Sequence, residues 1–371
     1  MNGDRSDFIF TGGVVHTVDP DNNIAQAVAV ADGKIIAVGS NATVKATAGP
    51  GTHHVELNGR SLTPGFIDAH QHFTGVGDMF YSIDCKSAGM DSISAIVDQV
   101  RVYAETQPAG TWIRGRGYDH SKLVENRHPN RHDLDAVSPD HPVLLTRTCG
   151  HIVAFNTKAA ELAGLSLQTD DPNGGRFDRD PDGKVSGVAY ERATGFFRDA
   201  SAPDREEIRK YLTAANQAVL ASGITSVHDA GGLLGPPIDI ATDLLNEGAI
   251  QVRLYAFATV SSFDHPLVKL LDGTGLRTGF GNDRLRIGAF KVMTDGSSSG
   301  PTASTRAPYH VDPDDSGILY WEQDELDELL GRAHRAGWQC TVHALGDRAI
   351  EQTLNAILVE MDGFETNTNI I

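Results

Sequence analysis

The sequence is poor in cysteine, in positive charge and in long apolar runs, and each shortage excludes a class of protein. Three cysteines occur in 371 residues, far apart and without a CxxC pair, so neither a disulfide framework nor a thiolate zinc site is expected. The formal net charge of −18 repels nucleic acids and anionic membranes. No stretch approaches the ~20 apolar residues of a membrane span, and the N-terminus lacks the apolar core of a signal peptide. We expect a cytoplasmic protein with no nucleic-acid and no membrane partner.

The composition that remains is globular, with 40% hydrophobic and 22% charged residues. Residues 8–61 consist of short apolar runs separated by glycine-containing turns, as is typical of β-hairpins. These turns lie at Gly12-Gly13, Asp32-Gly33 and Asn58-Gly59. A small antiparallel β unit is therefore predicted over residues 1–61.

Strands and helices alternate through much of the remaining chain, which predicts a parallel sheet, open or closed into a barrel. Strands are predicted at 62–68, 223–229, 252–260, 285–293 and 339–344, and helices at 204–222, 238–247, 322–336 and 348–361. The first strand alternates little, so it is predicted to be buried on both faces.

An insertion is predicted over residues 75–205, because this stretch is largely irregular and rich in turns. It contains a predicted helix at 91–107 and a predicted strand in PVLLTRTC. Within it, DRDPDGKVSGVAYE resembles a calcium-binding loop but has Ala189 where the loop needs glutamate. We interpret it as a β-hairpin that turns at 180–183.

Side chains suited to metal binding follow several predicted strands. His70 and His72 end the first strand, where alternate residues point to the same side. Polar groups on later strands are His228, Asp229, Lys291, Asp295 and His343. Singly, His228 is as well explained as a core histidine, and Lys291 as a lysine that reaches solvent. Together they favour one site, because the carboxyl ends of parallel barrel strands meet.

Ordered blocks along nearly the whole chain resemble the amidohydrolase superfamily, a group of metal-dependent hydrolases. The nearest branch is that of the N-substituted formamide deformylases and the amidohydrolase 3 proteins. The blocks include LTPGFIDAHQHF, GITSVHDAGG, FKVMTDGSSSGPTAS and TVHALGDRAIEQTLNAI. The resemblance implies an α/β fold: a (β/α)8 TIM-type barrel with a small β-sandwich built from both chain ends.

The resemblance also implies the chemistry. His70, His72 and His343 match metal ligands, and Lys291 matches a lysine that can be carbamylated and bridge two metals. One or two divalent ions, zinc being the expected metal, activate water that hydrolyses a non-peptide C–N bond in an amide, formamide or cyclic amide. His151, Glu191 and Asp295 are expected substrate contacts. The aspartate that follows the eighth strand in the family has no counterpart, so the base is left unknown.

The predicted barrel is incomplete, because about five strands can be counted where a barrel of roughly 250 residues has eight. We predict a β-sandwich portion over 1–61, a partial barrel over 62–74 and 206–371, and the insertion over 75–205. Two alternatives to a hydrolase stay open: a truncated, non-catalytic remnant, and a ligand-binding protein on the same fold. The expected partner is a small-molecule substrate, and a homo-oligomer is left open.

Overall fold

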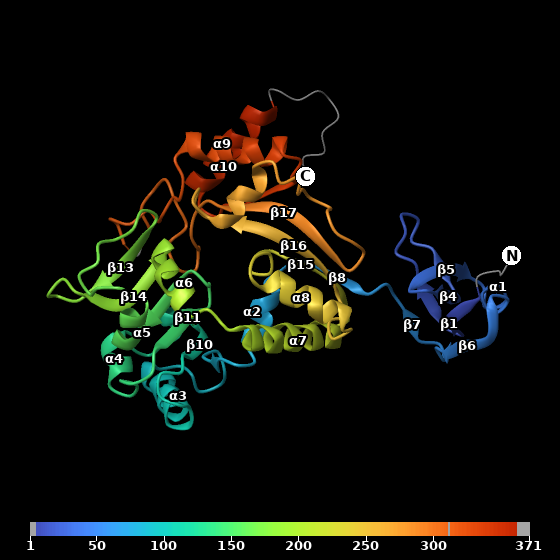
Figure 1. Cartoon of the computed structure of the whole chain (residues 1–371), viewed down its shortest axis with the longest axis horizontal. Coiled ribbons are helices and arrows are strands. Elements are labelled where there is room, and N and C mark those ends of the chain that lie inside the picture. Colours follow the sequence, from blue (N-terminus) through green and yellow to red (C-terminus); the bar gives the residue numbers. More distant parts are fainter. Residues whose placement is uncertain (1–4, 311, 362–371) are drawn as a thin grey trace. The chain divides into compact units, whose positions relative to one another are not determined.

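The computed structural model describes residues 5–310 and 312–361. The chain divides into two compact units, Met1–Phe66 and Ile67–Ile371, each of which is described by itself (Figure 1). Across the described ranges, no helix has both the length and the apolar character needed to cross a bilayer.

The first unit contains two small sheets with apolar side chains between them. One sheet has the order β5-β4-β1-β6 and the other β3-β2-β7. Their bounds are β1 Ser6–Thr11, β2 Val14–His16, β3 Ile24–Ala25, β4 Ala27–Ala31, β5 Lys34–Gly39, β6 Ala48–Glu56 and β7 Ser61–Leu62, with helix α1 at Asn41–Lys45. Val15 of β2 and Val28 of β4 belong to one apolar cluster, so the two sheets share a core.

The prediction of an antiparallel unit is correct at one turn and wrong at another. Asp32-Gly33 joins the antiparallel strands β4 and β5, with both residues at positive φ as a type I′ turn requires. Asn58-Gly59 also has positive φ but connects β6 of one sheet to β7 of the other. Moreover, β1 pairs with β6, and β2 with β7, in parallel. A tight turn fixes the local reversal of the chain, whereas burial of the apolar faces selects the strand partners.

The second unit contains the predicted parallel sheet, in the order β18-β17-β16-β15-β8. Figure 1 shows it curled into a half-barrel. The strands are β8 Phe66–Gln71, β15 Ile224–Asp229, β16 Arg253–Val260, β17 Leu285–Met293 and β18 Cys340–His343. The helices of this part are α2 Phe73–Asp78, α7 Arg205–Ala221, α8 Pro237–Asn246, α9 Gln323–Arg335 and α10 Asp347–Met361, with the short 3-10 helix η3 at Pro266–Leu271. Apart from the first strand, the predicted strands and helices of this alternation are confirmed to within one residue at each end.

One face of this sheet is covered by helices. Leu212 of α7 and Leu244 of α8 pack against Val227 of β15 and Leu254 of β16 in one buried cluster. Side chains alternate along β16, where Leu254, Ala256, Ala258 and Val260 are buried and the residues between them are not. Period-two burial of this kind places the second set of side chains on the face without helices.

The first strand of the sheet differs from its prediction. The predicted strand 62–68 is two segments, because Leu62 lies in β7 of the first unit and β8 begins at Phe66. β8 is also not buried on both faces: Phe66 is 63% exposed and Ile67 is 64% exposed. The reason is its position, since β8 is the edge strand of the five-stranded sheet.

The insertion is more regular than predicted. It contains a six-stranded sheet in the order β13-β14-β12-β11-β10-β9. The strands are β9 Ile83–Asp84, β10 Ile113–Tyr118, β11 Val143–Arg147, β12 Ile152–Phe155, β13 Gly175–Arg179 and β14 Val185–Glu191. The helices are α3 Ile93–Thr106, α4 Arg131–Asp135, α5 Thr157–Leu162 and α6 Phe196–Ala200, with 3-10 helices η1 His120–Lys122 and η2 Arg192–Gly195. The predicted helix, the predicted strand (β11) and the hairpin at 180–183 are confirmed. The remaining strands either are very short, as β9 and β12 are, or contain glycine, as β10, β13 and β14 do, and both features conceal the strand pattern.

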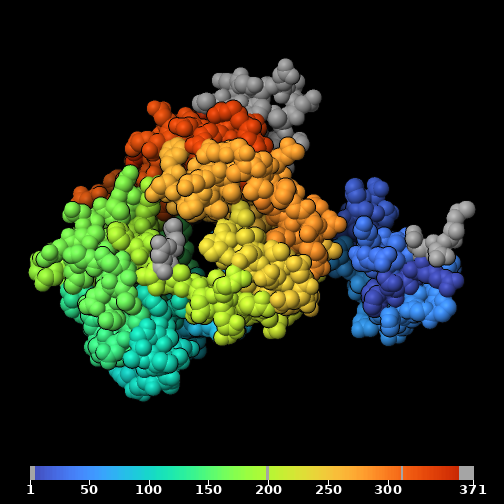
Figure 2. Space-filling view, in the orientation of Figure 1, coloured from blue at the N-terminus to red at the C-terminus, as the bar shows by residue number. Residues whose placement is uncertain are grey.

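Ion pairs join the insertion to the rest of the second unit. Arg114 of β10 lies 3.1 Å from Glu207 of α7, and Arg176 of β13 lies 2.5 Å from Asp315. In Figure 2 the green insertion touches the yellow and orange parts of the unit. The insertion is therefore positioned to contribute side chains to the carboxyl ends of the parallel strands.

Candidate active site

The first-strand histidines lie where β8 ends. The rings of His70 and His72 are 5.8 Å apart between centroids and nearly perpendicular. The backbone N–H of Ala230 donates to the Gln71 carbonyl at 2.7 Å, which links the ends of β8 and β15. His72 Nδ1 is 3.0 Å from the carbonyl oxygen of Gly231. When the proton of the neutral ring is on Nδ1 and is donated to this carbonyl, Nε2 of His72 keeps its lone pair. A histidine that binds a metal ion needs such a lone pair.

Asp229, at the end of β15, organises this region. Its side chain is fully buried and accepts from the backbone N–H groups of Phe73 at 2.8 Å and Leu233 at 2.9 Å. Burial nevertheless raises the pKa of its carboxyl group. Its neighbour His228 packs against Tyr255, with ring centroids 4.8 Å apart, on the sheet face without helices. His228 is only partly buried there, and both explanations given for it stay predictions.

Lys291 is the most unusual group in the sheet. Lys291 lies in β17, where it is paired in register with Thr259 of β16 and Thr341 of β18. Its side chain is only 5% exposed. Burial lowers the pKa of its ammonium group, and the nearby Asp229 opposes this effect in part. The structure thus enlarges the neutral fraction of this amine.

His343 ends β18, as the sequence predicts. Its Nε2 is 3.0 Å from the carbonyl oxygen of Gly296, and burial lowers the pKa of its ring. The bond to Gly296 leaves Nδ1 as the second ring nitrogen of a neutral imidazole. As with His72, one nitrogen is oriented by a backbone carbonyl and the other is suited to a metal ion.

The four predicted ligands come from three strands of one sheet. His70 lies in β8 and His72 directly follows that strand, Lys291 lies in β17, and His343 ends β18. Partial burial is the largest cause that lowers the pKa of the His70 ring, and Lys291 adds to it. Among residues 5–310 and 312–361, however, no three His, Cys, Asp or Glu side chains lie close enough to hold a metal ion. The nitrogen atoms of the four predicted ligands are suitable donors for a divalent ion. The described side chains do not, however, form a complete coordination site.

His151 and Glu191 bring the insertion to this site. The ring of His151 stacks on that of His343, with centroids 5.4 Å apart and an angle of 29°. Its Nδ1 is 2.7 Å from Glu191 Oε2, and the hydroxyl of Tyr320 donates to the same oxygen. The Glu191 side chain is fully buried, and within the described part of the chain its Oε1 accepts no hydrogen bond. A buried carboxylate thus orients one imidazole beside another.

The side chain of Asp295 is fixed by backbone hydrogen bonds. Its carboxylate accepts from the backbone N–H groups of Ser304 (2.9 Å), Leu345 (3.0 Å) and Gly346 (2.7 Å). It also lies 3.7 Å from His343 Nε2. These bonds tie the loops after β17 and β18 together. Contact with substrate stays a prediction for Asp295, as it does for His151 and Glu191.

Two groups escaped the sequence analysis. The hydroxyl of Tyr320, a residue 129 positions further along the chain, donates to Glu191. The side chain of Arg192 donates to the Tyr320 carbonyl at 2.7 Å. Neither lies in a recognisable motif. The positive φ of 52° at Glu191, unusual for a residue other than glycine, marks the site in the structure but is not visible in the sequence.

Comparisons with known proteins agree with this arrangement. Residues 54–364 match the family described as "Amidohydrolase family". The chain is 30% identical over 359 residues to YtcJ of Bacillus subtilis (strain 168) and 28% identical over 373 residues to the N-substituted formamide deformylase of Arthrobacter pascens. Each alignment covers 94% of this chain and 65% of the relative, so the chain spans about two thirds of their length.

A solved structure extends the agreement to the fold. The crystal structure of an uncharacterized metal-dependent hydrolase from Pyrococcus horikoshii OT3 superimposes with a TM-score of 0.73 at 26% identity, covering 96% of this chain and 68% of that one. Similarity of this extent in both sequence and structure shows common descent. The chain belongs to the amidohydrolase family.

Proposed function

We propose that this protein is a metal-dependent hydrolase that cleaves a non-peptide C–N bond in a small amide, formamide or cyclic amide. The observation that carries the proposal is the placement of His70, His72, Lys291 and His343 in or directly after three strands of one parallel sheet. The names of two relatives support it: one is an N-substituted formamide deformylase and another a metal-dependent hydrolase.

His70, His72 and His343 would hold the ion, with Lys291 as a fourth ligand. One or two zinc ions suit this set, because imidazole nitrogen is a preferred zinc ligand. When bound, a divalent ion supplies polarisation of the substrate carbonyl and activation of water. Carbamylation of Lys291 needs a neutral amine, and the lowered pKa of this group favours it.

The insertion would supply the proton-handling groups. Because a carboxylate only accepts, the hydrogen bond between His151 and Glu191 places a proton on His151 Nδ1. The other ring nitrogen, Nε2, then carries a lone pair that can accept a proton or a hydrogen bond from a substrate N–H. Glu191 acts here as a positioning residue, since it acts through His151.

The test is the double variant His70→Ala/His72→Ala, compared with the wild type and with His132→Ala. His132 is an exposed imidazole of the insertion whose Nε2 pairs with Asp180, so it controls for the loss of histidine. We expect the double variant to lose bound zinc, measured by mass spectrometry of the purified protein, and to lose hydrolysis of a panel of N-substituted formamides and cyclic amides. His132→Ala should keep both. Full zinc content and turnover in a folded double variant would contradict the proposal.

A further inference from the structure

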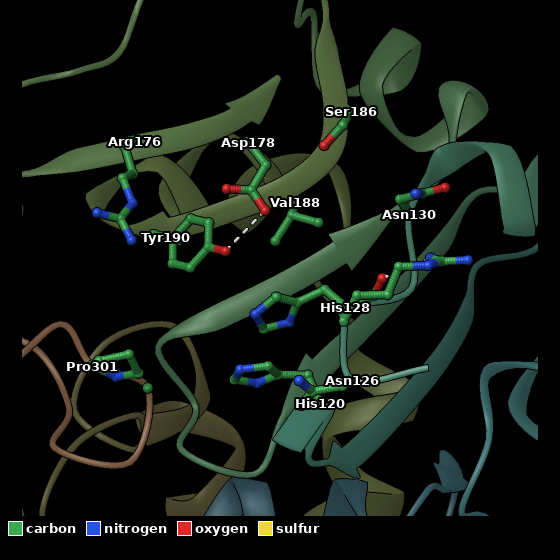
Figure 3. Close-up of a pocket in the computed structure, with 12 residues that line it drawn as sticks. His120, Asn126, His128, Asn130, Arg176, Asp178, Ser186, Val188, Tyr190 and Pro301 are labelled. Carbon is green, nitrogen blue, oxygen red and sulfur yellow. Dashed lines mark hydrogen bonds between the residues drawn. The ribbon is translucent and has the colours of Figure 1, made fainter. Parts of the chain in front are cut away.

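A cavity of about 310 Å³ lies in the insertion, apart from the groups used above (Figure 3). Figure 3 shows His120 and His128 one beside the other, with Tyr190 and Asp178 on the neighbouring strands and Pro301 on a loop at the side. The volume is at the small end of the range for small-molecule sites, which suits a single ring or a group of that size.

The two imidazoles form one wall of the cavity as a face-to-face stack. Their ring centroids are 4.0 Å apart with an angle of 25°, and Tyr190 meets His128 edge-on at 5.7 Å. The stack is fixed from behind, because Arg147 Nε donates to His120 Nδ1 and the Tyr118 hydroxyl lies 3.0 Å from His128 Nδ1. Arg147 and Tyr118 are almost fully buried, so the wall is built into the fold rather than formed by mobile surface side chains.

Both imidazoles are neutral. An arginine only donates, so the bond from Arg147 requires a lone pair on His120 Nδ1 and puts the proton of a neutral ring on Nε2. Burial, with His120 and Arg147 as further causes, lowers the pKa of His128 to about 3. The wall therefore offers π-faces and a neutral N–H donor rather than a cation.

The two guanidinium groups that line the cavity each have a carboxylate partner. Arg127 lies 2.7 Å from Asp133, and Arg176 lies 2.5 Å from Asp315 and covers the Tyr190 ring at 4.6 Å. The Tyr190 hydroxyl donates to Asp178 at 2.9 Å. Because each guanidinium already has a carboxylate partner, an anionic ligand would gain little binding energy from these groups. A neutral ligand is therefore expected.

The cavity adjoins the candidate active site through shared elements. Its walls include Gly300 and Pro301, which lie on the loop that begins at Asp295. Arg147 donates to Ser299 of that loop at 3.2 Å. Tyr190, on another wall, directly precedes Glu191 in β14 and points away from it across the strand.

We propose that this cavity is a specificity subsite that binds a neutral, planar ring of the substrate against the His120–His128 stack. The inference rests on the proposed function in one respect, because the ring is taken to be part of the substrate of a C–N hydrolase. Its substrate class is thus an amide or formamide that carries an aromatic or heteroaromatic substituent.

Binding can be tested separately from turnover. The full chain is titrated with benzamide, with cyclohexanecarboxamide of similar size but without a planar ring, and with benzoate as the anionic counterpart. Dissociation constants come from calorimetry, and ¹⁵N NMR of the histidine side chains reports on His120 and His128. We expect benzamide to bind about tenfold more tightly than either comparison compound, as one stacking contact allows, and to shift both imidazole signals.

Variants locate the binding. His120→Ala should weaken benzamide binding about tenfold, whereas His132→Ala should leave it unchanged. Should His120→Ala fail to fold, the binding of the three compounds to the wild type, together with the imidazole signals, tests the subsite without a variant. Equal binding of benzamide and cyclohexanecarboxamide, or no shift of the imidazole signals, would overturn the subsite.

The two proposals fail independently. In His70→Ala/His72→Ala, benzamide binding should persist although hydrolysis is lost. A wild type that binds benzamide here but hydrolyses no C–N bond would keep the subsite and refute the hydrolase. Hydrolysis without benzamide binding at these histidines would keep the hydrolase and refute the subsite.

Discussion

At the scale of single residues, Gly296 lies directly beside the buried Glu191 carboxylate. A side chain at position 296 would overlap Glu191 Oε1 and Thr302 Oγ1. The glycine thus lets a buried carboxylate pass next to the loop that follows β17. The same carboxylate orients His151, so the absence of a Cβ at 296 serves the geometry of the site.

Gly296→Ala tests this approach. Overpacking of a buried contact typically costs about 1–3 kcal/mol, so we expect the free energy of unfolding in urea to fall by that amount. Gly51 is the control, since no atom lies within 4 Å of a Cβ built there. Gly51→Ala should change the stability little, and an equal loss in both variants would count against the overlap.

His128 makes stability depend on pH. Its folded pKa of about 3 lies below the ordinary value of 6.5, so between these values the unfolded chain binds a proton that the folded chain excludes. Stability should therefore fall as the pH drops from 6.5 toward 3, by about 1.4 kcal/mol per pH unit from this residue.

The measurement is urea unfolding at several pH values for the wild type and His128→Gln. The variant should show a shallower loss of stability below pH 6.5, and His132→Gln should keep the wild-type slope. Identical slopes in the wild type and His128→Gln would mean that His128 is not held neutral by the fold.

At the scale of elements, strands and helices of the parallel sheet were predictable because their patterns are local. Helix α7 has a buried stripe that includes Ile208, Leu212 and Val219, and this spacing is visible in the sequence. Apart from β11, the strands of the insertion were not predictable, because two to seven residues, in three strands interrupted by glycine, carry little periodicity. The partners of β6 and β7 were also beyond reach, since pairing depends on faces brought together from distant segments.

The start of α7 provides a test of a local prediction. Asp204 accepts from the Glu207 backbone N–H at 2.8 Å, and the Glu207 side chain accepts from the Asp204 N–H at 3.0 Å. Asp204→Ala removes the cap and should lower the free energy of unfolding by about 1 kcal/mol. Glu206→Ala, in the same turn but 3.8 Å from its Lys210 partner, should cost less than half as much in the same urea titration. Equal losses in the two variants would show that the cap contributes nothing.

At the scale of the whole molecule, the two units have separate cores. Ile9 and Val44 belong to a cluster formed by the first unit alone, whereas Leu212 and Leu326 lie in clusters of the second. Each unit should therefore respond to core mutations by itself.

Ile9→Ala checks this independence. Ile9 is fully buried, and its truncation should destabilise the first unit by about 2–5 kcal/mol. Hydrogen exchange followed by mass spectrometry should show lost protection in peptides from residues 5–66 and unchanged protection in peptides from 67 onward. Ile35→Ala, at a position 66% exposed in the same unit, should change neither set. Loss of protection throughout the chain would indicate a shared core.

The sequence by itself determined the alternation of strands and helices, the family and the side chains that could bind a metal. These follow from local periodicity and from residue types at strand ends, which do not depend on distant contacts. Only the tertiary structure decided that His151 stacks on His343, that Glu191 is buried between His151 and Tyr320, and that His120 and His128 form a neutral wall beside the loop after Asp295. Most of those contacts join residues separated by tens to hundreds of positions, and close packing of several elements alone sets their distances and protonation.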